Sequence, residues 1–164
     1  MFLETEKEGE LASVMCHELA HLSQRHYARS QNRSSPLANA LMVLGSIVVA
    51  AASRNPEAIL IAPAAMQQMS INFTRSNEKE ADRVGFNNLV RAGFDPNDMT
   101  SMFQRMQDKY QTKSSEEFSY LMTHPLPSER LTDMKVRADN LPKSVNTIYR
   151  DNIDFYFMQK RAES

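Results

Sequence analysis

Two histidines and a glutamate share one short segment in the pattern His-Glu-x-x-His: His17, Glu18 and His21. On a helix, the four-residue step from His17 to His21 advances about 400°, so both imidazoles leave the same face one turn apart. Two such imidazoles can bind one Zn²⁺, and Glu18 can accept a proton from water at the metal. The alternative is chance, since any helix can carry these three residues, and a third ligand would decide between the two.

The other histidines and the single cysteine are the first candidates for that ligand. The chain has four histidines, and His26 is nine residues from His17, half a turn out of phase on a helix. We therefore expect His26 to be a partly exposed residue near a helix end. Cys16, beside the motif, is a conceivable ligand, but we expect a small packed residue behind the site. His124 remains as the fourth histidine.

An acidic run later in the chain offers carboxylates instead. Glu78 and Asp82 are four residues apart and share one helix face, whereas Glu80 lies about 200° from Glu78. A solvated acidic surface is the ordinary interpretation of such a run. Gly85 and Phe86 continue the face of Glu78 and Asp82, however, which indicates that it points inward. One carboxylate could bind metal while another orients an imidazole, but spacing alone does not fix the third ligand.

Composition and periodicity predict a mainly α domain. The 164 residues include 11 Met, 4 Gly and no Trp, and no segment alternates as a strand does. The net charge of −1 gives no sign of a nucleic-acid partner, and one cysteine excludes an intrachain disulfide. We expect helices over 6–29, 37–52, 57–91 (kinked at Pro63 or losing its first turn there), 96–110, a short stretch ending near 122, 128–140 and the tail to 164, with 123–127 extended.

The segment Leu37–Ala52 is almost uninterruptedly apolar. A membrane-spanning helix needs about 20 apolar residues, and this run has 16 positions that include Asn39, Gly45 and Ser46. We therefore expect no transmembrane span but a buried or partly exposed hydrophobic helix. Contact of Leu37–Ala52 with a membrane surface or an unfolded protein is the remaining alternative.

Three motifs in this order resemble the gluzincin peptidase family: His17-Glu18-x-x-His21, Glu78-x-x-x-Asp82 and His124-Pro125-x-Pro127-x-x-Arg130. That family includes HtpX-type membrane proteases, CAAX prenyl proteases and Oma-type mitochondrial proteases. The closest likeness is to the bacterial periplasmic branch, the BepA-like β-barrel assembly-enhancing proteases. The resemblance covers roughly residues 5 to 142 and implies a mainly α, zincin-like metalloprotease core.

The resemblance also implies roles for individual residues. It makes His17, His21 and Glu78 the ligands of one Zn²⁺ per chain and Glu18 the general base that later protonates the leaving amine. Asp82 would accept a hydrogen bond from a ligand histidine.

Two further residues match the family's third motif. His124 would lie over the metal, where it would either stabilise the oxyanion or close the fourth zinc position and keep the enzyme latent; an ordinary loop residue is the alternative. Arg130 would bind the substrate backbone or the oxyanion, against the alternative of a surface ion pair.

We therefore expect a zinc metalloendopeptidase with its catalytic core over 1–142 and a C-terminal helix over 143–164 that starts a linker or repeat region. In the family, strands and a substrate-binding sheet edge come before the motif helix, but only 16 residues precede His17 here, so we expect a core without those strands. The start of the chain has no apolar signal-peptide segment.

By resemblance, the protein acts in the periplasm on unfolded or misassembled outer-membrane proteins, with the outer-membrane assembly machinery as a further partner. The alternative function is a catalytically latent, zinc-binding chaperone or assembly factor, in which His17, His21, Glu78 and His124 supply the four ligands of a structural site. A membrane-embedded protease of the HtpX type would need hydrophobic spans that we do not expect in this sequence.

Overall fold

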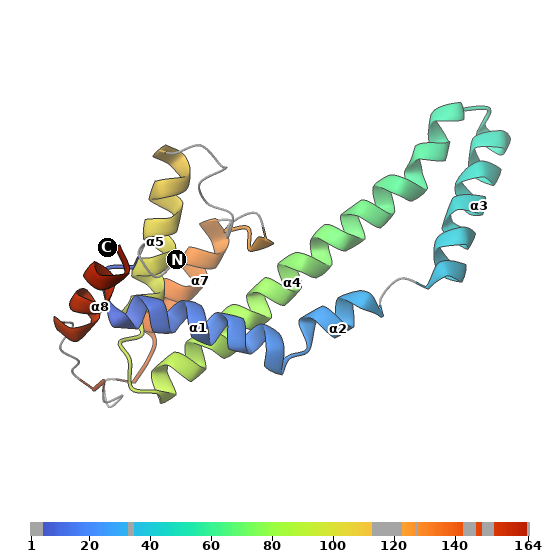
Figure 1. The fold of residues 1–164 in the computed structure, drawn as a ribbon. Helices are drawn as coiled ribbons and strands as arrows, with labels where there is room; N and C mark the ends of the chain where they lie inside the picture. Colours follow the sequence, from blue (N-terminus) through green and yellow to red (C-terminus); the bar gives the residue numbers. More distant parts are fainter. Residues whose placement is uncertain are drawn as a thin grey trace. The chain divides into compact units, whose positions relative to one another are not determined.

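The computed structural model describes residues 5–32, 35–112, 123–126, 128–142, 147–148 and 153–163. Over these ranges the chain forms helices and no strand, which confirms the mainly α prediction (Figure 1). It divides into two compact units. The motif unit contains Met1–Ser23 and Lys79–Ser164, and the insert unit contains Gln24–Glu78. The proposed boundary between 1–142 and 143–164 stays a prediction.

The motif unit is built on helices that bury a methionine-rich core. Its elements are α1 (Glu8–Ser23), the second part of α4 (Ile61–Arg91), α5 (Asn97–Thr112), α7 (Ser128–Asp139) and α8 (Ile153–Glu163). In Figure 1, α5 lies against both α1 and α7. The four apolar residues predicted to share one face of α5 are all buried, as predicted: Met99, Met102, Phe103 and Met106. Val14, Phe86, Leu89 and Met134 complete this core.

A glycine ends α4 where the sequence predicts a stop. Gly93 has φ +81, a left-handed conformation that suits glycine. The Phe94 N–H donates to the Leu89 carbonyl at 3.2 Å and the Gly93 N–H to the Val90 carbonyl at 3.0 Å. This pair of hydrogen bonds is the Schellman motif of a helix C-terminus. The chain therefore turns sharply here and lets α5 pack back on the core.

A buried carboxylate joins α1 to α5. Glu10 accepts hydrogen bonds from the Glu6 N–H (2.7 Å), the Ser101 hydroxyl (2.9 Å) and the Arg105 guanidinium (3.2 Å). Burial alone would raise the pKa of Glu10, but these donors leave it below its ordinary value. For Asp98, on the same side of α5, burial and the charges of Asp95 and Glu10 outweigh the opposing charge of Lys7 and raise its pKa to about 6.

Four expectations about local structure are wrong. In the described part of the tail, residues 147–148 are not helical and α8 begins only at Ile153, so the helix expected over 143–164 is shorter than predicted. The helix expected over 6–29 breaks after Ser23, because Arg25 adopts a left-handed conformation (φ 54) before α2 (His26–Gln31) begins. The Ser23 hydroxyl binds the Ala20 carbonyl, a local bond that competes with helix continuation. His26 is 3% exposed and so is buried, not partly exposed. Thr123 is helical instead of extended. The expected short helix ending near 122 lies outside the described residues.

The insert unit contains the apolar segment. Helix α3 (Pro36–Ser53) begins with Ser35, whose hydroxyl caps the Ala38 N–H, and with Pro36 in its first turn. A short 3₁₀ helix, η2 (Pro56–Leu60), follows and packs against α3. Pro63 falls in the first turn of α4, so the predicted separation of the first turn of helix 57–91 is confirmed.

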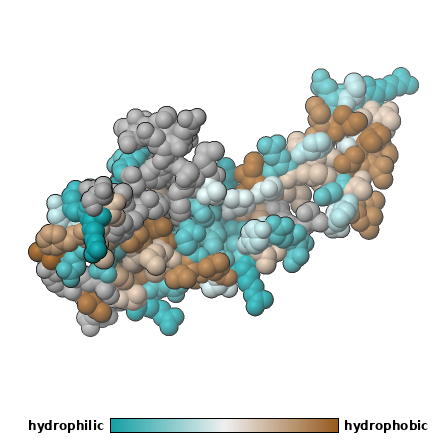
Figure 2. Space-filling model, in the orientation of Figure 1, coloured by the Kyte–Doolittle hydropathy of each residue, from teal (hydrophilic) through white to brown (hydrophobic). Residues whose placement is uncertain are grey.

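Helix α3 is exposed over most of its surface. Of its 18 residues, only Ser46 is buried, and Figure 2 shows apolar side chains gathered over this part of the insert unit. In the described part of the chain, α3 alone is long and apolar enough to cross a membrane, judged by length and composition. From the sequence, this run was expected to be slightly too short to cross a membrane.

Helices α1 and α4 approach closely at Gly85. A Cβ there would lie 3.0 Å from the Cα and backbone N of His17, so backbone would have to move. We expect Gly85→Ala to destabilise the protein by roughly 1–3 kcal/mol and to weaken metal binding at His17. Chemical denaturation and a competitive metal titration measure the two effects.

Gly45 in α3 is the matched control, because a Cβ there meets nothing within 4 Å. Gly45→Ala should leave metal affinity unchanged and raise stability by up to about 1 kcal/mol through helix propensity. Equal effects of the two substitutions would contradict the close packing of α1 on α4.

Candidate metal centre

Helix α1 brings the two motif histidines together. The Nε2 atoms of His17 and His21 lie 3.0 Å apart, with ring centroids 4.6 Å apart. His17 is buried and His21 half-buried. The sequence-predicted geometry, two imidazoles one turn apart on one face, is therefore present.

Helix α4 adds Glu78, which is 4% exposed. The ligand atoms of His17, His21, Glu78 and His124 all lie within 4.8 Å of one another. Glu78 is the last residue assigned to the insert unit, but one uninterrupted helix carries it and Asp82. Of the two carboxylates left open by spacing, Glu78 is the one that joins the histidine nitrogens.

This donor set fits a zinc ion. Tetrahedral zinc with Zn–N bonds of 2.0–2.1 Å separates two nitrogens by about 3.3 Å. The observed separations are 3.0 Å between His17 and His21 and 3.5 Å between His17 Nε2 and His124 Nδ1. Imidazoles with a carboxylate are also ligands that zinc accepts readily.

Cys16 takes no part in the donor group. It is half-buried against the hydrophobic core, and burial raises the pKa of its thiol. A thiol held in its neutral form is a poor metal ligand. The prediction of a small packed residue behind the site is confirmed.

Asp82 lies one turn after Glu78 and reaches the other side of the His17 ring. Its Oδ1 is 3.0 Å from His17 Nδ1, and both side chains are 1% exposed. A carboxylate at this nitrogen favours the tautomer whose Nε2 lone pair points toward the donor group. The role that the resemblance implies for Asp82, accepting a hydrogen bond from a ligand histidine, stays a prediction.

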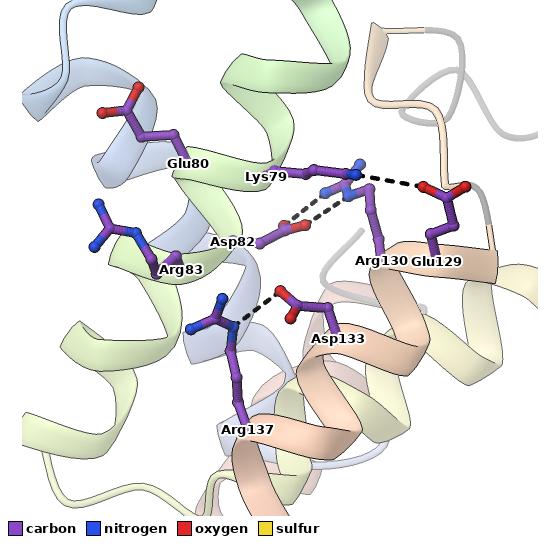
Figure 3. Close-up of a pocket in the computed structure, with 8 residues that line it drawn as sticks. All are labelled: Lys79, Glu80, Asp82, Arg83, Glu129, Arg130, Asp133 and Arg137. Carbon is purple, nitrogen blue, oxygen red and sulfur yellow. Dashed lines mark hydrogen bonds and ion pairs between the residues drawn. The ribbon is translucent and has the colours of Figure 1, made fainter.

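Arg130 binds the Asp82 carboxylate through two hydrogen bonds (Figure 3). Its Nε and Nη2 donate to Asp82 Oδ2 and Oδ1 at 2.6 and 2.7 Å, while Nη1 donates to the Pro125 carbonyl at 2.7 Å. The guanidinium also lies 5.2 Å from the centre of the Phe103 ring. With 3% exposure, Arg130 is not the surface ion pair that the sequence left as an alternative.

His124 lies at the donor group and near Glu18. Its Nδ1 faces His17, and its Nε2 is 3.6 Å from Glu18 Oε1. The half-buried ring therefore stands between the donor atoms and the carboxylate predicted to be the base. The hydrogen bond from Arg130 to Pro125 holds the next residue of this segment.

A pocket of about 400 Å³ opens beside the Asp82–Arg130 pair. Most of its charges are matched, since Lys79 lies 3.3 Å from Glu129 and Arg137 lies 2.9 Å from Asp133 (Figure 3). None of the four donor residues lines it. The lining consists of Lys79, Glu80, Asp82, Arg83, Glu129, Arg130, Asp133 and Arg137.

Comparison with known families decides the classification. The model of peptidase family M48 matches residues 1–138. The chain belongs to peptidase family M48. The resemblance found from the three motifs is thereby confirmed.

Within M48, the chain is similar to bacterial assembly-enhancing proteases. It is 48% identical over 149 residues to a putative beta-barrel assembly-enhancing protease of Vibrio cholerae, covering 87% of this chain and 30% of the relative. The beta-barrel assembly-enhancing protease of Escherichia coli K12 is 40% identical over 171 residues, covering 99% and 33%. The mitochondrial metalloendopeptidase OMA1 of Schizosaccharomyces pombe is 30% identical, covering 76% and 35%. The chain spans about a third of the length of these curated relatives.

The Arg130–Asp82 pair can be tested through metal affinity. Arg130→Met leaves the Asp82 carboxylate buried without its bidentate partner, so we expect a loss of about 3–5 kcal/mol in unfolding free energy. Zinc affinity should fall about 10- to 100-fold, because His17 loses its oriented partner. Denaturation of the metal-free protein and zinc competition measure the two separately.

Arg137→Met is the control, on the same helix and beside the same pocket. Its pair with Asp133 is a half-exposed i,i+4 contact, for which about 0.3–0.5 kcal/mol and no change in zinc affinity are expected. If both variants kept wild-type zinc affinity, Arg130 would have no part in positioning the ligand.

Proposed function

We propose that this M48 chain is a zinc-dependent metalloendopeptidase domain. The observation that carries the proposal is the convergence of His17, His21 and Glu78 in one donor group with Glu18 next to His17 on the same helix. A bound zinc ion would polarise the scissile carbonyl and lower the pKa of water. The family's metal dependence and the fit of the donor set to zinc support this assignment.

The chain's own residues then have distinct tasks. His17, His21 and Glu78 hold the ion, while Asp82 and Arg130 fix the orientation of the His17 ring. Glu18 takes the proton from the attacking water and delivers it to the leaving amine. Arg130 acts as a positioning residue, because its three donating nitrogens are used by Asp82 and the Pro125 carbonyl.

For His124, we propose the latching role. A ring nitrogen of His124 belongs to the same donor group as the three ligands, and its Nδ1 lies 3.5 Å from His17 Nε2. The chain therefore offers a fourth donor where a hydrolytic site needs an open position. In this arrangement His124 excludes water, and the protease is closed until the segment that carries His124 withdraws.

The substrates we propose are unfolded or misassembled outer-membrane proteins in the periplasm. The names of the bacterial relatives support this, since those proteins are assembly-enhancing proteases for β-barrels. The outer-membrane assembly machinery is the corresponding partner.

Glu18→Gln tests the catalytic assignment. Removing the base while keeping the side chain's size should lower the cleavage rate of a fluorescently labelled unfolded casein by at least about 10²-fold, with zinc content unchanged. The same substitution at exposed Glu57 should change neither quantity.

The rival function, a latent zinc-binding assembly factor, is favoured by the four-donor group. If this function is correct, the Glu18→Gln variant and the wild type have the same cleavage rate, and removal of zinc still unfolds the protein. That result would overturn the peptidase proposal.

His124→Ala tests the latch. Removing the fourth donor opens a coordination position, so we expect cleavage of the same casein to rise several-fold while one zinc per chain is retained. A fall in rate with normal zinc content would instead assign His124 to stabilisation of the oxyanion.

A further inference from the structure

The exposed surface of α3 is apolar, whereas the exposed face of a helix in a water-soluble protein is usually polar. At 100° per residue, the exposed Leu41, Leu44 and Val48 fall within about 40° of Leu37. The exposed Val43, Ile47 and Val49 fall at about 240°, 280° and 120°. Exposed apolar side chains therefore cover an arc of about 240°. An ordinary surface helix has a polar outer face and an apolar inner one.

The polar side chains of α3 lie on the side away from this apolar arc. Asn39 and Ser46 fall at about 200° and 180° in the same frame, and they are half-buried and buried. The Ser46 hydroxyl is satisfied within the helix, donating to the Val43 carbonyl at 2.7 Å. Ser53, the last residue of α3, is exposed but falls at about 160°, and its hydroxyl donates to the Val49 carbonyl at 2.7 Å. No polar side chain of α3 therefore falls within the apolar arc, which suits a hydrocarbon surrounding.

The absence of charge on α3 also suits an apolar surrounding. Helix α3 has no charged residue over 18 positions, and the next ones, Arg54 and Glu57, come at its end. A groove in a partner protein would cover one stripe of a helix, whereas only a fluid apolar phase contacts an arc of about 240° at once. The occupant that fits this surface is lipid.

We propose that α3 docks the protein on a lipid bilayer by lying in the plane of the membrane interface. Its length, about 27 Å at 1.5 Å per residue, would lie along the surface with the apolar arc among the upper acyl chains. The covered side, with Asn39 and Ser46, stays against its own unit.

The order of the ligands along the chain excludes a simple span by α3. His17 and His21 precede α3 and Glu78 follows it, yet all belong to one donor group, so they must be on one side of a membrane. If α3 crossed, the first half of α4 would have to cross back. That half carries exposed Gln67 and Gln68, which are costly in hydrocarbon.

Single tryptophans can test the docking, because the chain has none. Leu37→Trp, Leu44→Trp and Val48→Trp, each in the full chain, place a reporter on the same stripe. With phosphatidylcholine vesicles we expect a blue shift at all three positions and equal quenching by lipids brominated at a shallow acyl position. A spanning helix would separate Leu37 from Val48 by about 16 Å in depth and overturn the in-plane placement.

Vesicle flotation tests the affinity and its source. The triple variant L41Q/L44Q/V48Q should bind at least about tenfold more weakly. The control is Y156Q/F157Q/M158Q on α8, which removes a similar exposed apolar set from the motif unit and should bind as the wild type does. Adding phosphatidylglycerol should strengthen binding by no more than several-fold, because α3 itself carries no basic residue and Arg54 follows at its end.

Three further results would overturn the proposal. The wild type could fail to float with vesicles, or the α8 variant could lose binding as much as the α3 variant. Sedimentation could instead show self-association that the α3 substitutions abolish without any vesicle binding, in which case a second copy covers this surface. Zinc content, which the α3 substitutions should not alter, shows in each case that the protein is folded.

Discussion

The buried pair of Asp82 and Arg130 is the interaction on which the rest of the site depends. Two charges at 1% and 3% exposure are costly to desolvate, and only bidentate geometry makes the pair tolerable. The pair joins three parts of the motif unit: His17 on α1, α4 itself, and the segment with Pro125 that α7 holds through Arg130. Phe103 of the hydrophobic core also packs against the Arg130 guanidinium. The same arginine therefore contacts both the core and the carboxylate next to His17.

The close approach of α1 and α4 also fixes the positions of the donor residues. Gly85 leaves no side chain between the helices, so the backbone of His17 rests on α4 itself. The same two helices supply both motif histidines, Glu78 and Asp82, and their donor atoms are therefore fixed by backbone packing as well as by hydrogen bonds. A site placed on paired helices in this way is better defined than one placed on loops.

Much of this could be predicted from the sequence, and the rest has identifiable physical reasons. Helical spacing alone placed His17 and His21 on one face and Glu78 with Asp82 on another, because those relations are local. The partner of Arg130 could not be predicted, because 48 residues separate it from Asp82 and an arginine in a first helical turn is usually exposed. The break at Arg25 was missed because Ser23 and Gln24 do not signal a helix end as glycine or proline does. The exposure of α3 depends on tertiary structure, which periodicity does not contain.

The methionine core has a consequence for the chemical lifetime of the protein. Met99, Met102, Met106 and Met134 are at most 1% exposed, whereas Met15, Met69 and Met158 are more than half exposed. Oxidation to the sulfoxide puts a polar oxygen on a side chain that the core holds as apolar. Peroxide should therefore modify the outer methionines at once and the inner four only when the helices separate. The rate of the slow phase of sulfoxide formation would then report how often the core opens spontaneously. Mass spectrometry can follow this phase without any denaturant.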